Sequence, residues 1–176
     1  MKLTILVTCA LLAALWLDMS ASAANPEHLR RLLNYKECRK CNLSKADLTG
    51  AELSNADLRG AYLAGANLQK ANLSGAKLTR ADLTNAILSE AKLQAADLQA
   101  ASLNNANLRN ADLRQTTMNF ATLIEADLRQ ADLRGAYLIN ANLRKAFIDG
   151  VDLTSVVLTG ATMPNGKIFN LRTLRQ

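Results

Sequence analysis

The pair Cys38 and Cys41 forms a C-x-x-C motif, the part of this sequence best suited by residue type and spacing to covalent chemistry. Such a pair can form a disulfide, act as a redox centre or contribute to a metal site. Haem attachment would need histidine where the chain has Asn42, and zinc would need a second pair of ligands. A redox pair lacks the βαβ context of thioredoxin-like proteins, which leaves a disulfide or two buried thiols as the main alternatives.

Other groups that could support catalysis are sparse. His28 is the single histidine. The sequence has no Ser-His-Asp set, no phosphate-binding loop and no insertion that would form a cleft. Carboxylates are numerous, but the pattern described below places them on a convex surface in contact with water. We therefore expect no enzymatic activity and no cofactor.

Residues 1–23 have the pattern of a secretory signal peptide. Lys2 gives a positive start, Leu3 to Leu17 form an apolar stretch, and residues 21–23 are a small-residue cleavage site. The apolar stretch is shorter than the roughly 20 residues of a membrane-spanning helix. We expect cleavage near Ala24 and export to the periplasm, or to the thylakoid lumen if the source is photosynthetic. An oxidising compartment favours the disulfide over free thiols.

The net charge of +6 lies at the ends of the chain. Residues 41–163 contain twelve basic and twelve acidic residues, whereas residues 24–40 and 164–176 each carry a charge of +3. A basic stripe along the body, which nucleic-acid binding would need, is absent from the sequence. We therefore expect no nucleic-acid partner.

A five-residue period runs through residues 41–163 without an insertion. From Leu43 on, every fifth residue is Leu in 22 of 25 positions, and the residue two before it is Ala in 21 of 25. In an α-helix each step of five residues turns about 500°, so the leucines would not share a face. In a straight strand successive alanines would face opposite sides. The pattern requires a short extended A-x-L piece followed by a two-residue corner, so that the chain coils around its leucines.

Units such as residues 46–50, Ala-Asp-Leu-Thr-Gly, resemble the pentapeptide-repeat family, whose motif is A-[DN]-L-[ST]-x. The resemblance implies an all-β solenoid over residues 41–165, a right-handed quadrilateral β-helix with four units per coil and short helical caps. About six coils at ~4.8 Å each give a rod of roughly 30 Å. Leu and Ala would fill its interior and leave no room for a ligand. Val151 and Val156 replace Ala, so the last coils should be wider or packed differently.

Residues 24–40 are expected to cap the first coil, because a coil leaves unpaired backbone groups at its edge. Asn25 as N-cap and Pro26 in the first turn predict an amphipathic helix over residues 26–34, with His28 on its surface. Extended backwards, the period makes Cys38 a Leu position and Cys41 an Ala position. A disulfide between them would then join the cap to the first coil.

Residues 166–176 are expected to be either a second cap, which we favour, or a tail that binds a partner. The segment begins within Pro164-Asn165-Gly166, which breaks the repeat. Its apolar residues are suited to both roles: Ile168, Phe169, Leu171 and Leu174.

Four units per coil place residues 20 apart above one another, so charged columns can be read from the sequence. Lys70 over Glu90 and Glu125 over Lys145 predict weak surface ion pairs. A column of like charges consists of Asp112, Asp132 and Asp152. These carboxylates could hold a cation, but we favour the alternative that neighbouring arginines neutralise them. Two stacked pairs of arginines, Arg109 over Arg129 and Arg114 over Arg134, predict a basic strip. This strip would be either a solvated surface or a site that binds an anion.

One exposed apolar group is expected near the C-terminal end, on a rod that is otherwise polar outside. An exposed apolar patch of this kind indicates a contact surface. It would bind a protein partner, bind a second copy of the chain, or receive the C-terminal tail. Its members are Thr117, Phe120, Tyr137, Ile139 and Val157.

The sequence thus predicts an exported structural or protein-interaction module, a monomer or homodimer without a membrane anchor after signal cleavage. The segment from Asn34 to Leu43, of the type N-Y-K-E-C-x-x-C-N-L, resembles exported cyanobacterial and chloroplast lumenal members of the family. Some members mimic DNA and inhibit a topoisomerase, but they have a strongly acidic surface and act in the cytoplasm. The neutral rod, the basic ends and the signal disfavour that alternative. Ice or mineral binding would need a flat face of regularly repeated Thr, whereas the Thr residues here are scattered.

Overall fold

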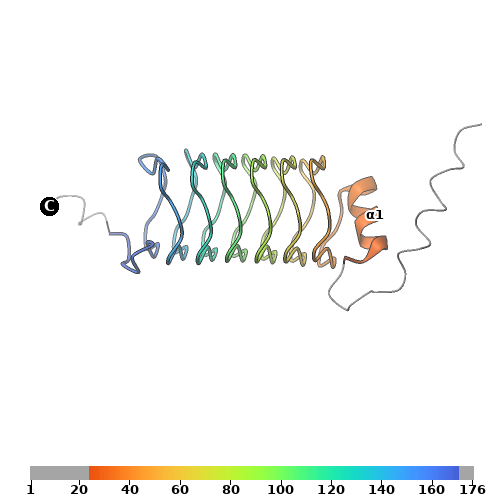
Figure 1. Ribbon diagram of the computed structural model, residues 1–176, viewed down its shortest axis with the longest axis horizontal. Coiled ribbons are helices and arrows are strands. Elements are labelled where there is room, and N and C mark those ends of the chain that lie inside the picture. Colours follow the sequence, from red (N-terminus) through yellow and green to blue (C-terminus); the bar gives the residue numbers. More distant parts are fainter. Residues whose placement is uncertain (1–23, 171–176) are drawn as a thin grey trace, which may run out of the picture.

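The computed structural model describes residues 24–170 as one short helix followed by a continuous four-sided coil (Figure 1). Helix α1 spans Pro26–Tyr35. The coil is held by parallel single-residue bridges between residues 20 apart, the first of which joins Glu37 to Asp57. The prediction of an all-β solenoid with four pentapeptides per coil is confirmed. The predicted signal peptide, residues 1–23, and residues 171–176 lie outside the described residues.

Each unit is an extended stretch of three residues followed by a two-residue turn. The second turn residue has a positive φ in every unit from Lys40 to Gly150, with values such as 67° at Gly75 and 61° at Phe120, whereas Ser155 in the last coil does not. Glycine adopts this conformation freely, whereas other residues reach it at some cost. The turn is closed by a backbone hydrogen bond, as between the N–H of Ala56 and the carbonyl of Leu53 at 3.1 Å. These corners turn the chain once per unit and aim every Leu inward.

Successive coils are joined by a regular set of backbone hydrogen bonds. The N–H of Leu58 donates to the carbonyl of Lys77 at 2.8 Å, and the N–H of Lys77 donates to the carbonyl of Ala56 at 2.8 Å. The corner takes part as well, since the N–H of Gly60 donates to the carbonyl of Thr79 at 2.9 Å. The backbone of the inner coils is therefore bonded within the rod, and only its ends offer open edges.

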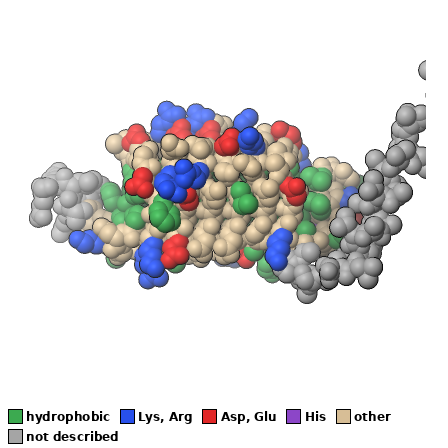
Figure 2. Space-filling model, in the orientation of Figure 1, with side chains coloured by type: hydrophobic (Ala, Val, Ile, Leu, Met, Phe, Trp, Pro, Cys, Tyr) green, Lys and Arg blue, Asp and Glu red, His purple; other side chains and the backbone are tan. Residues whose placement is uncertain are grey.

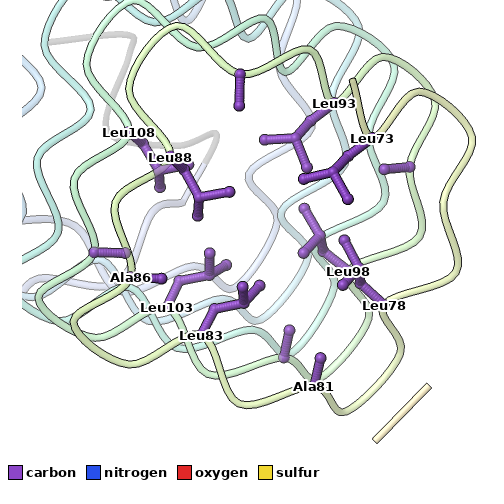
Figure 3. Packing of buried hydrophobic residues seen from close by; sticks show 14 of the residues in the cluster. Leu73, Leu78, Ala81, Leu83, Ala86, Leu88, Leu93, Leu98, Leu103 and Leu108 are labelled. Carbon is purple, nitrogen blue, oxygen red and sulfur yellow. The ribbon is translucent and has the colours of Figure 1, made fainter. Parts of the chain in front are cut away.

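The interior consists of Leu and Ala side chains stacked from coil to coil (Figure 3). Leu73 and Leu93 lie one coil apart in one such column, and both are fully buried. Burying one such side chain contributes about 1.5–3 kcal/mol, and this sum opposes the conformational entropy of the chain. Thr116 replaces one Ala, and its buried hydroxyl donates to the carbonyl of Leu113 at 2.7 Å. The core is thus continuous and its one buried hydroxyl among the described residues is satisfied.

The N-terminal end of the β-helix begins one unit earlier than expected. Residues 36–40 already form the bridge and the turn of a unit, so the boundary between cap and coil lies at residues 35 and 36 instead of 40 and 41. Helix α1 starts with the Asn25 side chain accepting the N–H groups of Glu27 and His28. It covers the first coil with Leu32, which is fully buried.

The C-terminal coil is looser than the others. We number the four faces from the bridge at Glu37, so that the fourth face carries the column Glu52, Asn72, Lys92, Asp112, Asp132 and Asp152. The ladder of this face ends with the bridge between Asp112 and Asp132, and within residues 24–170 no bridge continues it to Asp152. Several inward residues here are only half-buried, including Val151 and Val156, where Val replaces the smaller Ala, whereas Leu158 and Ala161 remain buried. The last coil is thus packed differently, as expected, at the two positions where Val stands in place of Ala.

Residues 164–169 turn back across part of this last coil. Ile168 pairs antiparallel with Thr162, and the N–H of Phe169 donates to the carbonyl of Ala161 at 2.7 Å. Phe169 is half-buried against the core, whereas Ile168 is 67% exposed. This part of the predicted cap or tail acts as a partial cap, and Leu171 and Leu174 lie outside the described residues.

Replacing Leu93 with Ala should lower the free energy of unfolding by about 2–5 kcal/mol, because it leaves a cavity in a fully buried column. Urea denaturation followed by circular dichroism measures the change. The matched control is Lys92→Ala at the adjacent exposed position, which should change stability by no more than about 0.5 kcal/mol. Similar losses in both variants would contradict the inward position of Leu93.

Candidate interaction surface

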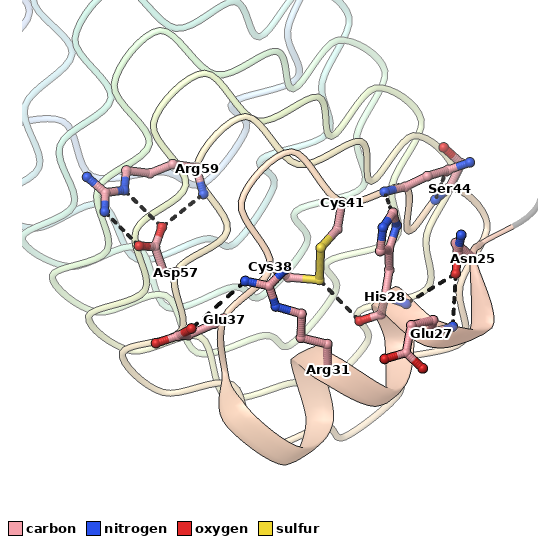
Figure 4. The surroundings of a disulfide bond; sticks show 11 residues. Asn25, Glu27, His28, Arg31, Glu37, Cys38, Cys41, Ser44, Asp57 and Arg59 are labelled. Carbon is pink, nitrogen blue, oxygen red and sulfur yellow. Dashed lines mark hydrogen bonds and ion pairs between the residues drawn. A yellow bond between two sulfur atoms is a disulfide. The ribbon is translucent and has the colours of Figure 1, made fainter.

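The two cysteines lie at the mouth of the first coil, next to helix α1 (Figure 4). The structure joins Cys38 and Cys41 in a disulfide with an S–S distance of 2.14 Å, and both residues are buried. The bond was expected to join the cap to the first coil. It instead connects two positions that both belong to the first coil. The Sγ atom of Cys38 lies 3.1 Å from the carbonyl oxygen of His28, so the pair also packs against the helix.

Helix α1 is attached to the coil through the backbone of Asn42. The N–H of Asn42 donates to Nδ1 of His28 at 2.9 Å, and its carbonyl accepts from the N–H of Asn25 at 2.9 Å. One coil further on, the N–H of Tyr62 donates instead to the carbonyl of Cys41. His28 thus replaces the missing coil as an acceptor. The expectation that it is a surface residue was wrong, since it is half-buried and has a structural role.

The aspartate column on the fourth face is neutralised by arginines of the chain itself. Arg114 binds Asp112 with its guanidinium at 2.8 Å and approaches Asp132 at 3.7 Å, and Arg134 binds Asp132 at 2.6 Å. The hydrogen bond from Arg134 lowers the pKa of Asp132 below its usual value. Asp152 instead accepts hydrogen bonds from Thr154. Within residues 24–170 no three acidic, His or Cys side chains lie close enough to hold a metal ion.

The four arginines of the predicted basic strip do not lie on one surface. Arg109 and Arg129 occupy the corner before the fourth face, and Arg114 and Arg134 occupy the corner after it, with the aspartate column between them. The first pair is also neutralised, because Arg129 and Arg109 lie 2.7 and 3.5 Å from Asp127. The predicted strip is therefore two separate stacks, because each pair of arginines lies at a different corner. Both stacks are largely neutralised, because their arginines bind aspartates.

The predicted surface ion pairs are present. Lys70 lies 3.7 Å from Glu90, and Lys145 lies 3.0 Å from Glu125. All four side chains are largely exposed, so each pair contributes at most about 1 kcal/mol. Figure 2 shows charged side chains of both signs interleaved along one edge of the rod, with hydrophobic side chains grouped toward its ends.

The apolar residues predicted to share a face are brought together. Tyr137 forms bridges with Thr117 and Val157 in one ladder, and the N–H of Phe120 donates to the carbonyl of Ile139 at the adjoining corner. Phe120, Tyr137 and Val157 are 56%, 47% and 36% exposed, and Ile139 is half-buried. We call Phe120, Tyr137, Ile139 and Val157 the apolar patch.

A groove that the sequence analysis missed runs along the corner next to the apolar patch. Its volume is about 480 Å³. It could have been found by reading the corner column at steps of 20 residues, in which long and small side chains alternate before an aromatic one. Its lining residues are Lys40, Arg59, Gly60, Thr79, Arg80, Gln99, Ala100 and Phe120.

Two further surface features were not expected. The guanidinium of Arg129 lies over the ring of Phe147, 5.3 Å from its centroid, which shields this exposed aromatic residue. A second hollow of about 700 Å³ opens at the C-terminal end, where the last coil is loose. It is lined mainly by apolar residues, including Leu153, Val156 and Phe169.

A coil of five-residue units with four faces and a solid aliphatic interior defines the right-handed quadrilateral β-helices, a class of solenoid proteins. The chain belongs to the pentapeptide repeat family. The family model for pentapeptide repeats matches in 8 copies, over residues 41–80, 56–94, 91–130 and 121–160. Members of this family are generally structural or interaction modules.

Several solved structures of this family are similar to the chain. HetL, a protein involved in heterocyst differentiation regulation in Nostoc sp. strain PCC 7120, is 36% identical over 76% of this chain and 66% of its own, with a TM-score of 0.35. Rfr23 of Cyanothece 51142 is 31% identical over 74% of this chain and 97% of its own, with a TM-score of 0.31. A protein of the Arabidopsis thaliana thylakoid lumen is 30% identical over 58% of this chain and 68% of its own, with a TM-score of 0.28.

The chain thus spans just under two thirds of the HetL structure. No curated protein matches the chain. In the part that the structure describes, no helix has both the length and the apolar character needed to cross a membrane.

Thiol labelling tests the disulfide and the predicted signal cleavage together. Protein recovered from a bacterial periplasm should show no adduct with a thiol-reactive polyethylene glycol under denaturing, non-reducing conditions, and two adducts after reduction. One adduct before reduction would indicate that Cys9 is retained with the leader. Two or more would contradict the disulfide. As a control, Cys38→Leu with Cys41→Ala restores the repeat residues and should lower the free energy of unfolding by no more than about 2 kcal/mol.

Acid should weaken the fold through Asp127 and Asp132, whose pKa values are lowered mainly by hydrogen bonds from Arg129 and Arg134. A carboxyl group with a lowered pKa in the folded state stabilises the protein above its unfolded pKa of about 3.9 and loses this contribution as the pH falls through the folded value. The free energy of unfolding should therefore decrease below about pH 4.

Between pH 7 and pH 3, the free energy of unfolding of the variant Asp127→Asn with Asp132→Asn should decrease less than that of the wild type. The difference between the two decreases should be less than about 1 kcal/mol for each ion pair removed. Asp82→Asn with Asp97→Asn is the matched control, because these carboxylates accept hydrogen bonds from Thr84 and Thr79 and form no ion pair with arginine in the described residues. An equal acid response in both double variants would contradict the assignment.

Proposed function

We propose that the protein is an exported, non-enzymatic protein-interaction module whose contact surface is the apolar patch. The observation that carries this proposal is the grouping of Phe120, Tyr137, Ile139 and Val157 on one side of a rod whose other columns are mostly polar. Exposed aromatic and aliphatic side chains gathered in this way are typical of interaction sites.

The architecture supports binding rather than chemistry. The interior is filled with Leu and Ala, and the surface is convex, so that carboxylates remain in contact with water. The backbone of the inner coils is bonded from coil to coil, which leaves side chains as the means of recognition along the rod. A rigid scaffold holds these side chains at fixed spacing and lowers the entropy lost on binding.

Export is supported by the signal pattern of residues 1–23 and by the buried cysteine pair, since disulfides persist in oxidising compartments. A related protein of the Arabidopsis thaliana thylakoid lumen, 30% identical, is consistent with a lumenal or periplasmic location. We propose a lumenal location if the source is photosynthetic and a periplasmic location otherwise.

DNA mimicry is the weaker alternative. QnrB1, a plasmid-mediated fluoroquinolone resistance protein, shares the fold but is only 19% identical. Residues 41–163 of this chain have equal numbers of acidic and basic residues. Four of these twelve acidic residues are bound to arginine, as Asp127 is to Arg129. A neutral rod does not reproduce the charge of a DNA backbone, which carries one negative charge per about 1.7 Å.

Affinity capture from the native compartment tests the apolar patch. The double variant Tyr137→Ser with Ile139→Ser should lose at least about nine tenths of a protein captured by the wild type, because removing anchors of a contact surface costs more than about 1 kcal/mol each. The matched control is Tyr62→Ser with Ile87→Ser, which changes exposed apolar residues elsewhere on the rod. Identical captured proteins from wild type and patch variant would refute the proposal. If the protein that the wild type captures and the patch variant loses is a second copy of the chain, the apolar patch is a homodimer interface.

A further inference from the structure

We propose that the corner groove binds an acidic protein segment in polyproline II conformation, with acidic residues at its first and fourth positions and an apolar residue at its seventh. This inference rests on the proposed function, because Phe120 belongs both to the groove and to the apolar patch. It adds the chemistry and the conformation of the partner.

The groove has its shape because its column alternates in size. Positions 20 apart at this corner are Lys40, Gly60, Arg80, Ala100 and Phe120. Gly60 has no side chain and Ala100 has only a methyl group, so gaps separate the long side chains. The stem of Lys40 lies over Gly60, with Cγ 3.5 Å from the place of a Cβ atom there. The result is a channel along the rod that ends at an aromatic ring.

The groove carries positive charge that the chain does not neutralise. Lys40 and Arg80 are exposed, and neither forms an ion pair with any described residue. Arg59 also lines the groove, but its guanidinium binds Asp57 at 2.6 Å. None of the lining residues is acidic. This contrasts with the four arginines of the predicted basic strip, which are paired with aspartates, and it makes an acidic partner the complementary one.

Recognition in the groove depends on side chains, because its backbone is already bonded. The N–H of Arg80 donates to the carbonyl of Gln99, and the N–H of Ala100 donates to the carbonyl of Asn119, both at 2.9 Å. A partner therefore cannot bind here by adding a strand. The side-chain amide of Gln99 forms no hydrogen bond with the described residues and can bind a partner's backbone.

The spacing of the three contacts selects the conformation of the partner. Lys40, Arg80 and Phe120 are successively two coils apart, which is about 9.6 Å at ~4.8 Å per coil. In an extended strand, side chains on one side repeat about every 6.7 Å, which does not match. In polyproline II, side chains on one side repeat every three residues, or about 9.3 Å. Acidic residues three apart would thus meet Lys40 and Arg80, and an apolar residue three further on would meet Phe120.

The test uses the full-length chain and the fluorescently labelled peptide Glu-Pro-Pro-Glu-Pro-Pro-Phe, together with its reversed sequence, because the geometry does not fix the direction of binding. Fluorescence anisotropy measures the dissociation constant. At least one of the two peptides should bind the wild type, more weakly at high salt because exposed charges are screened. A version with Gln in place of Glu, and one with both Glu adjacent, should bind at least about fivefold more weakly.

The variants keep the strained corner intact. Asn tolerates the positive φ at these positions, and Asn140 occupies the same corner one coil after Phe120. Lys40→Asn with Arg80→Asn should weaken binding at least about fivefold, and so should Phe120→Asn. The matched control is Lys70→Asn with Lys145→Asn, which removes equal charge from the same turn position at other corners and should change binding by less than about twofold.

The inference is overturned if neither peptide binds at concentrations up to about 1 mM, if the Gln version binds equally well, or if the groove variant and the control behave alike. The result is separable from that of affinity capture. Loss of capture with Tyr137→Ser and Ile139→Ser, together with peptide binding that ignores Lys40 and Arg80, would sustain the proposed function and refute the groove. The opposite pattern would sustain the groove and refute the patch.

Discussion

The structure depends on one constraint, which is that every fifth residue must place an aliphatic side chain in a shared interior while the backbone turns a corner. Leu packing supplies the free energy, and the positive φ at the end of nearly every unit supplies the direction. Because four units complete a coil, residues 20 apart meet on the surface. The apolar patch, the groove and the charged columns are all consequences of this register.

The fold was predictable because the period is a property of the sequence alone, and no residue outside the repeat is needed to interpret it. Columns followed from the same period, so the ladder of Tyr137 and Val157 and the pair of Lys70 and Glu90 were expected correctly. The period placed Cys38 at a Leu position, but the unit of residues 36–40 was assigned to the cap because Lys36 and Cys38 stand where the repeat has Ala and Leu. The helix was expected from the N-cap, the Pro and the apolar spacing of its residues.

The details of the surface were less predictable, because they depend on which side chains meet across a corner. Arg109 and Arg114 are close in sequence, but a corner and a face separate them, and each arginine turns back to an aspartate instead of toward the other. The role of His28 was also hidden, since only the packing of the cap on the coil shows that its Nδ1 accepts the N–H of Asn42. The periodicity determines where residues lie, whereas rotamers and end contacts determine what they bind.

The 20-residue coil also limits how the chain can change in length. Inserting one unit after Gly135 would rotate every later residue by a quarter turn, which would move Tyr137 and Val157 away from the corner of Phe120 while leaving the interior packed. Inserting four units would lengthen the rod by about 4.8 Å and restore the alignment of every face. Stability therefore tolerates steps of five residues, whereas the surface that contacts other molecules tolerates only steps of twenty.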